Sequence, residues 1–428
     1  MLKAIQWLLG RLSPWLYQRW RTAGLQSRQQ QIETAQASVM AAEPRIQEQR
    51  LITRLLQLYY PDSELRTHNL RRYSFEINGR RITTSIASRS SWLGLHLPIN
   101  DRDFDRFPLL KSTVPLPSVT EEEQHRIIET IVKKGVRFDN KPVFALRSFT
   151  PCDTGVLASF SLAEYKNYKV TLGLLEEELV QALVDADLDP KLAFEKRESL
   201  LMGRNKFLRD CKTIAEYSNR LCVGGTNVLL AFRRSEENDF VFFLKRRSRK
   251  VSTGRGVFSL IPSGMHQPDL VANARKEAPI AATVYRETLE ELFGGKEVET
   301  SNGHQADRRY RFAEQLHWFE TANPKQFILE LVSFGLNLFD GTFEFGVLLV
   351  VKDERYWRRY EGDIQVNDEV DDNKTPPFST KDTKGLAEII EDPRCADTSL
   401  IALVEGLRRL KQIEPTRVSL PEIEVIGL

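Results

Sequence analysis

The chain is poor in the residues that most often build metal or disulfide sites. Its four cysteines, Cys152, Cys211, Cys222 and Cys395, are far apart and form no CxxC pair. Its six histidines show no metal-ligand spacing such as HExxH. The sequence therefore argues against a zinc site or a disulfide framework. It favours a reducing compartment, and we expect a cytoplasmic protein.

Long apolar runs and a strong net charge are also missing. No stretch reaches the roughly 18 apolar residues that span a bilayer. The formal net charge of +2 gives no strong nucleic-acid signal. Residues 1–21 mix Trp and Leu with Lys and Arg, which is typical of an amphipathic helix. Two interpretations stay open: peripheral contact with a membrane surface, or packing on the protein itself or on a second copy in a homodimer.

The length of 428 residues favours two domains plus extensions over a single core. Composition and patterning place the boundaries. We expect an N-terminal helical extension (1–60), an α/β region of unknown role (61–215), a second α/β domain (216–415) and a C-terminal tail (416–428).

In the first half, Asn78-Gly79 lies between two alternating runs, which predicts a β-hairpin. Thr120 and Glu123 predict a capping box at the start of a helix. Residues 172–188 form an amphipathic pattern whose three consecutive glutamates, 176–178, we interpret as a solvated face. A linking helix is expected over residues 190–217.

The second half is rich in apolar runs separated by turn residues, which predicts strands. The acidic segment 363–384 is expected to be a loop. The expected strands are 222–232, 240–244, 257–261, 327–337 and 343–351, and the expected helices are 276–293 and 398–410.

Residues 281–295 carry the pattern that predicts chemistry. Glu287 lies three residues before Glu290 and four before Glu291, so a helix places the three carboxylates on one face. Crowded carboxylates repel one another unless a cation lies among them, and hard oxygen ligands suit Mg²⁺ or Mn²⁺. Arg286, four residues before Glu290, is placed to hold that carboxylate. A solvated, charged helix face is the alternative.

Arg286-Glu287-x-x-Glu290-Glu291 after a glycine turn at Gly264 resembles the Nudix box, the signature of Nudix hydrolases. The resemblance implies a mixed-sheet α/β/α sandwich. It also implies a Mg²⁺- or Mn²⁺-dependent pyrophosphatase that cleaves a nucleoside diphosphate linked to another group, giving a nucleoside monophosphate and a phosphorylated remainder.

The resemblance also implies roles for single residues. Glu290 and Glu291 match the principal metal ligands, Glu287 a ligand or general base, and Gly264 the turn whose backbone approaches the metal. A further acidic residue often assists, and Glu330 and Glu344 are candidates. Two interpretations of Lys245, Arg246 and Arg247 stay open: contact with substrate phosphates, or solvated surface charge.

The sequence departs from the family pattern around this core. The loop between Gly264 and Arg286 is about eight residues longer, and Ala278 stands where the family has its first glutamate. Glu277 is one position away and substitutes only if the helix starts irregularly. These departures favour an alternative function, a catalytically weakened Nudix-fold module that binds a nucleotide or metabolite and regulates a partner. A scaffold at a membrane surface, resting on residues 1–21 alone, is the third interpretation.

Overall fold

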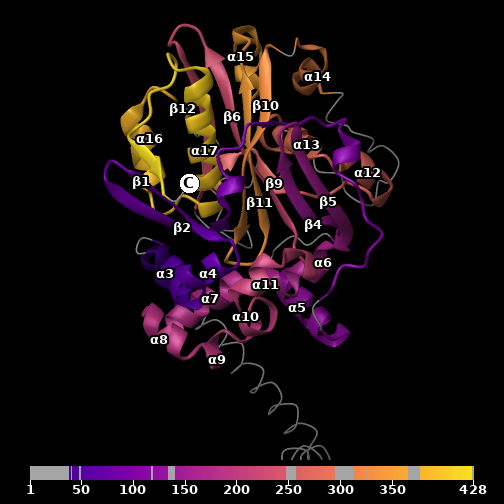
Figure 1. Ribbon diagram of the computed structural model, residues 1–428, viewed down its shortest axis with the longest axis vertical. Helices are drawn as coiled ribbons and strands as arrows, with labels where there is room; N and C mark the ends of the chain where they lie inside the picture. The colour runs from indigo at the N-terminus through magenta and orange to yellow at the C-terminus, as the bar shows by residue number, and fades with distance from the viewer. Residues whose placement is uncertain are drawn as a thin grey trace, which may run out of the picture.

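The chain folds around one large mixed β-sheet in this computed structural model (Figure 1). The structure describes residues 38–39, 41–47, 50–116, 119–133, 140–246, 257–294, 313–323, 325–364 and 376–426. Along its main path the strand order is β12-β7-β6-β11-β10-β2-β1-β13. These strands are β1 (Arg71–Ile77), β2 (Arg80–Ser88), β6 (Gly224–Arg234), β7 (Asp239–Arg246), β10 (Phe327–Asn337), β11 (Phe343–Val351), β12 (Phe378–Ser379) and β13 (Ile423–Val425). The expected mixed α/β class is confirmed.

Three short strands attach to this path. They are β3 (Leu97–Pro98) on β10, β8 (Phe258–Ile261) on β7 and β9 (Ser263–Met265) on β6. At the centre, β6 and β11 run parallel, whereas the other named pairs of the sheet are antiparallel. The central strands are buried on both faces, which explains their nearly continuous apolar sequences.

The hairpin predicted at Asn78-Gly79 is confirmed, with φ angles of 49° and 79° at the two turn residues. Its strand β2 pairs with β10, and its strand β1 pairs with β13. The sheet therefore runs across position 215, where the sequence placed a boundary between two separate regions. The division into domains stays a prediction, but strands from both sides of that boundary share one sheet.

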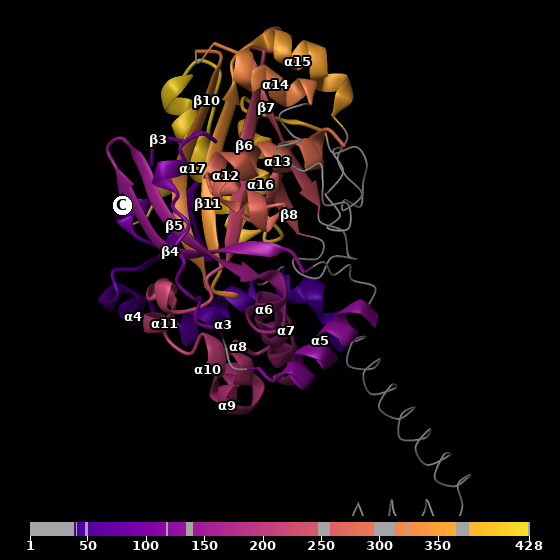
Figure 2. The same cartoon turned by 90° about the vertical axis from the view of Figure 1, so that its right-hand side faces the viewer.

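Helices and a second hairpin cover the two faces of the sheet (Figure 2). One face carries α13 (Ile280–Leu292) and the hairpin of β4 (Pro142–Cys152) and β5 (Gly155–Glu164). The other face carries α17 (Asp397–Ile413), close to the helix expected over 398–410. Side chains alternate between two apolar clusters along β6, with Val228 in one and Leu229 in the other. This is a sandwich of α, β and α layers.

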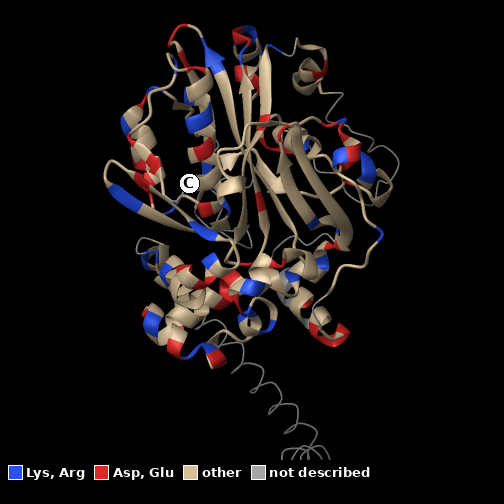
Figure 3. Cartoon of the chain, in the orientation of Figure 1, with Lys and Arg blue, Asp and Glu red and all other residues tan. Residues whose placement is uncertain are grey.

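Helices from the first half gather at one end of the sheet, at the bottom of Figure 1. Charged residues are frequent along these helices and rarer along the central strands (Figure 3). The helices are α3 (Leu51–Tyr59), α4 (Asp62–Thr67), α5 (Glu121–Lys133), α6 (Tyr165–Lys169), α7 (Leu175–Asp185), α8 (Pro190–Glu195), α9 (Arg197–Leu200), α10 (Met202–Phe207) and α11 (Cys211–Ala215). Further α-helices among the described residues are α12 (Ala274–Glu277), α14 (Glu314–Thr321), α15 (Glu354–Tyr360) and α16 (Thr383–Glu391).

The single helix expected over residues 190–217 is wrong, because that segment forms the four short helices α8 to α11. The tertiary contacts of Arg204 contribute to this. Its guanidinium is fully buried and donates to the carbonyl of Leu338 at 2.8 Å. It also bonds the hydroxyl of Tyr60 at 2.9 Å. Both partners lie far outside residues 190–217, so helical spacing within the segment carries no information about these contacts.

Two further expectations need correction. Glu178 does not lie on a solvated face, since its carboxylate accepts the backbone N–H groups of Gly203 at 2.6 Å and Arg204 at 3.0 Å and so caps α10. The segment 363–384 is not all loop, because β12 and the first residues of α16 fall inside it.

The capping box is confirmed: the Glu123 amide donates to the Thr120 hydroxyl at 3.2 Å, and the Thr120 amide donates to the Glu123 carboxylate at 3.1 Å. All four cysteines are free thiols. Among the described residues, no helix combines the length and apolar character that crossing a membrane requires. The amphipathic segment 1–21 lies outside the described residues.

Candidate active site

The glutamate-bearing helix α13 begins later than expected. Ala278 and Pro279 separate it from α12, and Pro279 has an extended ψ of 134°. Proline has no amide hydrogen and clashes with a preceding helical turn, so one continuous helix over 276–293 is excluded. The helix ends at Leu292, and Gly294 follows with a φ of 65°. A glycine in the left-handed region is a common helix end, and the expected end near residue 293 is confirmed.

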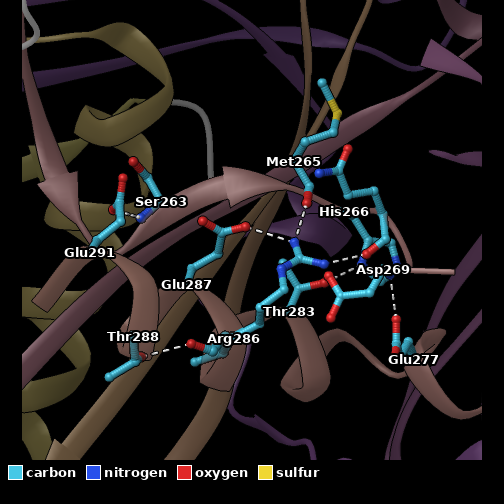
Figure 4. A network of polar contacts seen from close by, with 12 residues as sticks. Ser263, Met265, His266, Asp269, Glu277, Thr283, Arg286, Glu287, Thr288 and Glu291 are labelled. Carbon is cyan, nitrogen blue, oxygen red and sulfur yellow. Dashed lines mark hydrogen bonds and ion pairs between the residues drawn. The ribbon is translucent and has the colours of Figure 1, made fainter. Parts of the chain in front are cut away.

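Glu287 and Glu291 both face strand β9 (Figure 4). A Cβ atom at Gly264 would overlap the carboxyl group of Glu287, so glycine alone leaves room for it. The backbone N–H of Ser263 donates to Oε2 of Glu291 at 2.8 Å. The two carboxylates, one helical turn apart, thus converge on the Ser263–Gly264 backbone.

Glu290 lies beside this pair but is more exposed. Together with Glu287 and Asp269 it acts electrostatically on Arg286. Burial alone would lower the pKa of the Arg286 guanidinium, but these three carboxylates raise it above its usual value. Arg286 is therefore a permanent cation at this site.

Arg286 links α13 to the segment after β9. Its guanidinium donates to the carbonyls of Met265, at 2.8 Å, and Gln267, and to Oε1 of Glu287 at 2.6 Å. Arg286 is hydrogen-bonded to Glu287, and Glu290, against which the sequence placed it, also acts on it electrostatically. This ties the orientation of Glu287 to the position of the β9 backbone.

Glu277 also holds the segment after β9. Its Oε2 accepts the backbone N–H of Asp269 at 2.7 Å. The break at Pro279 gives the irregular start under which Glu277 was expected to substitute for the missing glutamate at Ala278. Glu277 thus supports the loop that Arg286 holds from the other side.

The three basic residues expected to contact substrate differ in position. Lys245 lies on β7 on the same face as Phe243, and its ammonium group contacts Oε1 of Glu291. Arg246 follows it and lies on the opposite face of the strand, as alternation requires. Arg247 is outside the described residues. Lys245 is thus buried, and its ammonium group points toward the carboxylates.

Glu330 and Glu344 do not join the site. Glu330 forms a two-point ion pair with Arg409 of α17 at 2.8 and 3.0 Å. Glu344 accepts from Asn227 at 3.0 Å, and Asn227 also bonds Ser399 of α17. Both carboxylates therefore lie on the α17 face, on the opposite side of the sheet from α13.

His266 directly follows β9 and was not among the predicted site residues. Its Nδ1 lies 2.7 Å from the Thr283 hydroxyl of α13, and its ring lies 4.5 Å from Phe144 and 4.8 Å from Phe160 between centroids. Burial, and then the charge of Arg286, lower the pKa of His266 from 6.5 to about 3. It is therefore neutral at pH 7. Since the aromatic partners come from β4 and β5, no local signal predicts this environment.

The Lys245–Glu291 ion pair was missed too, although the sequence contains a signal. Val241 and Phe243 precede Lys245 at alternate positions of β7, so a lysine there continues a buried face. A charged side chain on such a face is almost never fully buried unless it is paired.

The carboxylates fit a hard divalent cation by donor type, and the space at Gly264 brings them to one stretch of backbone. They are not assembled into a three-ligand set. In the part of the chain that the structure describes, no three His, Cys, Asp or Glu side chains are grouped so that they could hold a metal ion. Arg286 and Lys245 instead pair with Glu287 and Glu291.

No protein-family model matches this chain, and no curated protein matches it.

Proposed function

We propose that the chain hydrolyses a phosphoanhydride in a nucleoside-diphosphate-linked substrate with Mg²⁺ or Mn²⁺, through a Nudix-like site on α13 and β9. The convergence of Glu287 and Glu291 on the Ser263–Gly264 backbone carries the proposal. It is the arrangement that the Arg-Glu-x-x-Glu-Glu spacing and the glycine turn imply together. The sheet between α13 and α17 supports the finer assignment of a Nudix-like sandwich.

The three glutamates and Arg286 of α13 have different roles in this proposal. Glu290 and Glu291 would hold the cation, which neutralises phosphate charge when bound. Glu287 accepts the proton of the attacking water on its carboxylate. Arg286 keeps Glu287 in one orientation through the 2.6 Å hydrogen bond, and it fixes β9 relative to α13 through the Met265 carbonyl. The burial of Glu287 and Glu291 strengthens the electrostatic interactions of both carboxylates.

A second function is favoured by the same ion pairs. Because Lys245 and Arg286 already neutralise Glu291 and Glu287, the site is also consistent with a module that binds a nucleotide or metabolite without turnover and regulates a partner. The experiment below separates these two functions.

The test is hydrolysis by the purified full-length chain with Mg²⁺ or Mn²⁺ over dinucleotides, nucleotide sugars and nucleoside triphosphates. We expect turnover of one substrate class and a loss of about 100-fold or more in the double variant Glu290→Gln/Glu291→Gln. Glu176→Gln/Glu177→Gln, an adjacent acidic pair on α7, is the matched control and should keep full activity.

Absence of turnover over the whole panel would overturn the hydrolase if the protein is folded. If such a protein still binds a nucleotide, measured by calorimetry, the regulatory module becomes the assigned function.

A further inference from the structure

Lys245 and Glu291 form an ion pair inside the protein. The side chains are 5% and 7% exposed, and they come from β7 and α13. Removing two charges from water is costly unless their contacts compensate for it. The pair therefore lies in the interior of the protein rather than on its surface.

Both oxygens of Glu291 already have donors. Oε1 contacts the Lys245 ammonium, and Oε2 accepts the Ser263 backbone N–H at 2.8 Å. The Ser263 amide is held by the pairing of β9 with β6, in which Ser263 is opposite Asn227. Lysine is a point charge on a flexible four-carbon stem, so it is the donor that can move.

Resting on the proposed function, we propose that Lys245 is a built-in cation that competes with the divalent metal for Glu291. A metal ion takes Oε1 of Glu291 only when the ammonium leaves it. The displaced ammonium then turns to a phosphate oxygen of the substrate, with which a lysine pairs readily. The site therefore holds a metal ion weakly alone and more tightly together with a diphosphate group.

Ser259 provides a hydrogen-bond acceptor beside Lys245 for that movement. It is the residue paired with Lys245 across β7 and β8, so the two side chains lie on the same face. Its hydroxyl is buried and has no hydrogen-bond partner among the residues that the structure describes. An ammonium group leaving Glu291 has this acceptor beside it, which lowers the cost of breaking the ion pair.

The test is binding of Mn²⁺ alone, measured by electron paramagnetic resonance on the full chain. Lys245→Met keeps the apolar stem and removes the charge, and we expect it to bind Mn²⁺ about tenfold tighter or more. A tenfold change corresponds to about 1.4 kcal/mol. Arg246→Met, the neighbour on the other face of β7, is the matched control and should bind as the wild type does. Adding Glu291→Gln to Lys245→Met should abolish the gain.

Equal Mn²⁺ affinity of wild type and Lys245→Met, with both weakened by Glu291→Gln, would overturn the competition and leave the metal site of the proposed function standing. Absence of Mn²⁺ binding in every variant would overturn both.

Wild-type protein provides a second measurement if Lys245→Met does not fold. Reductive methylation, followed by mass spectrometry, reports how accessible each lysine amine is. We expect Lys245 to be protected without Mn²⁺ and to react faster at saturating Mn²⁺. The same rate in both conditions would overturn the proposal.

Discussion

Two glycines at the pairing of β6 with β9, Gly225 and Gly264, differ in what an added side chain would meet. A Cβ at Gly225 of β6 would overlap the carbonyl oxygen of Gly264, whereas a Cβ at Gly264 would overlap the Glu287 carboxyl group. A backbone carbonyl in a paired strand cannot yield, but the end of a glutamate side chain can. The first glycine is thus needed for folding and the second for placing a carboxylate.

Gly264→Ala should therefore separate stability from function. We expect a small loss of stability, a displaced Glu287 and a loss of hydrolysis in the activity assay above. Gly225→Ala, the comparison variant, should lose about 1–3 kcal/mol because overpacking moves backbone. Urea denaturation and activity assays report the two effects. Full activity in a folded Gly264→Ala protein would contradict the role assigned to Glu287.

His266 predicts a pH dependence of stability. Its folded pKa of about 3 lies below the unfolded value of 6.5, so the unfolded chain binds the extra proton. The contribution of His266 to the free energy of unfolding is fully present above pH 6.5. It decreases as the pH drops toward about 3, by at most about 1.4 kcal/mol per pH unit. The free energy of unfolding of His266→Gln, measured by urea denaturation, should change less with pH than that of the wild type. His125→Gln, an exposed histidine on α5, should keep the wild-type slope. Parallel curves for wild type and His266→Gln would contradict this.

At the scale of elements, the sequence predicted what depends on local signals. Four features were located correctly because their signals act within a few residues. They are the hairpin at Asn78-Gly79, the capping box of Thr120 and Glu123, and the strands β10 and β11. The segment of α8 to α11 also makes contacts far along the chain, such as that of Arg204 with the Leu338 carbonyl, and periodicity alone does not predict these.

The same limit applies to the candidate site. The spacing of Glu287 and Glu291 is local, and their shared face was predictable. The partner of Glu291 is Lys245, which reaches it only after β7 and α13 pack together. The location of Glu330 and Glu344 on the α17 face depends on which face of the sheet each helix covers, and local sequence patterns do not contain that information.

Glu178 allows a test of one such long-range contact. Glu178→Ala removes the acceptor for two amides of α10, and we expect a loss of about 0.5–2 kcal/mol, the usual cost of a lost helix cap. Glu177→Ala, the exposed neighbour, should change stability far less. Chemical denaturation of both variants measures the difference. Equal losses would show that the cap does not stabilise α10.

At the scale of the whole molecule, both halves of the sequence build one sheet. β2 covers the edge of β10, and the hairpin of β4 and β5 is joined to the central part through hydrogen bonds from Phe144 to the His266 carbonyl and from Leu146 to the Cys222 carbonyl. The two nearest aromatic rings of His266, Phe144 and Phe160, thus come from the region whose role the sequence left unknown. Charge lies mainly on the surrounding helices (Figure 3).

A fragment of residues 216–428 should therefore not fold by itself. It retains β10 without its partner β2, and an uncovered strand edge invites association. We expect insoluble protein or no cooperative unfolding transition by circular dichroism. A fragment of residues 38–428 keeps every described strand and is the control. A stable monomer from residues 216–428 would instead establish an independent domain beginning near the predicted boundary.

The pairing of β1 with β13 has a consequence for synthesis on the ribosome. Phe75 of β1 lies opposite Val425 of β13, so this edge of the sheet is completed only after the intervening chain has been translated. At about 5–20 residues per second, β1 waits tens of seconds for its partner. During that time its outer edge is a site for chaperone binding or for pairing with a neighbouring nascent chain on the same messenger RNA.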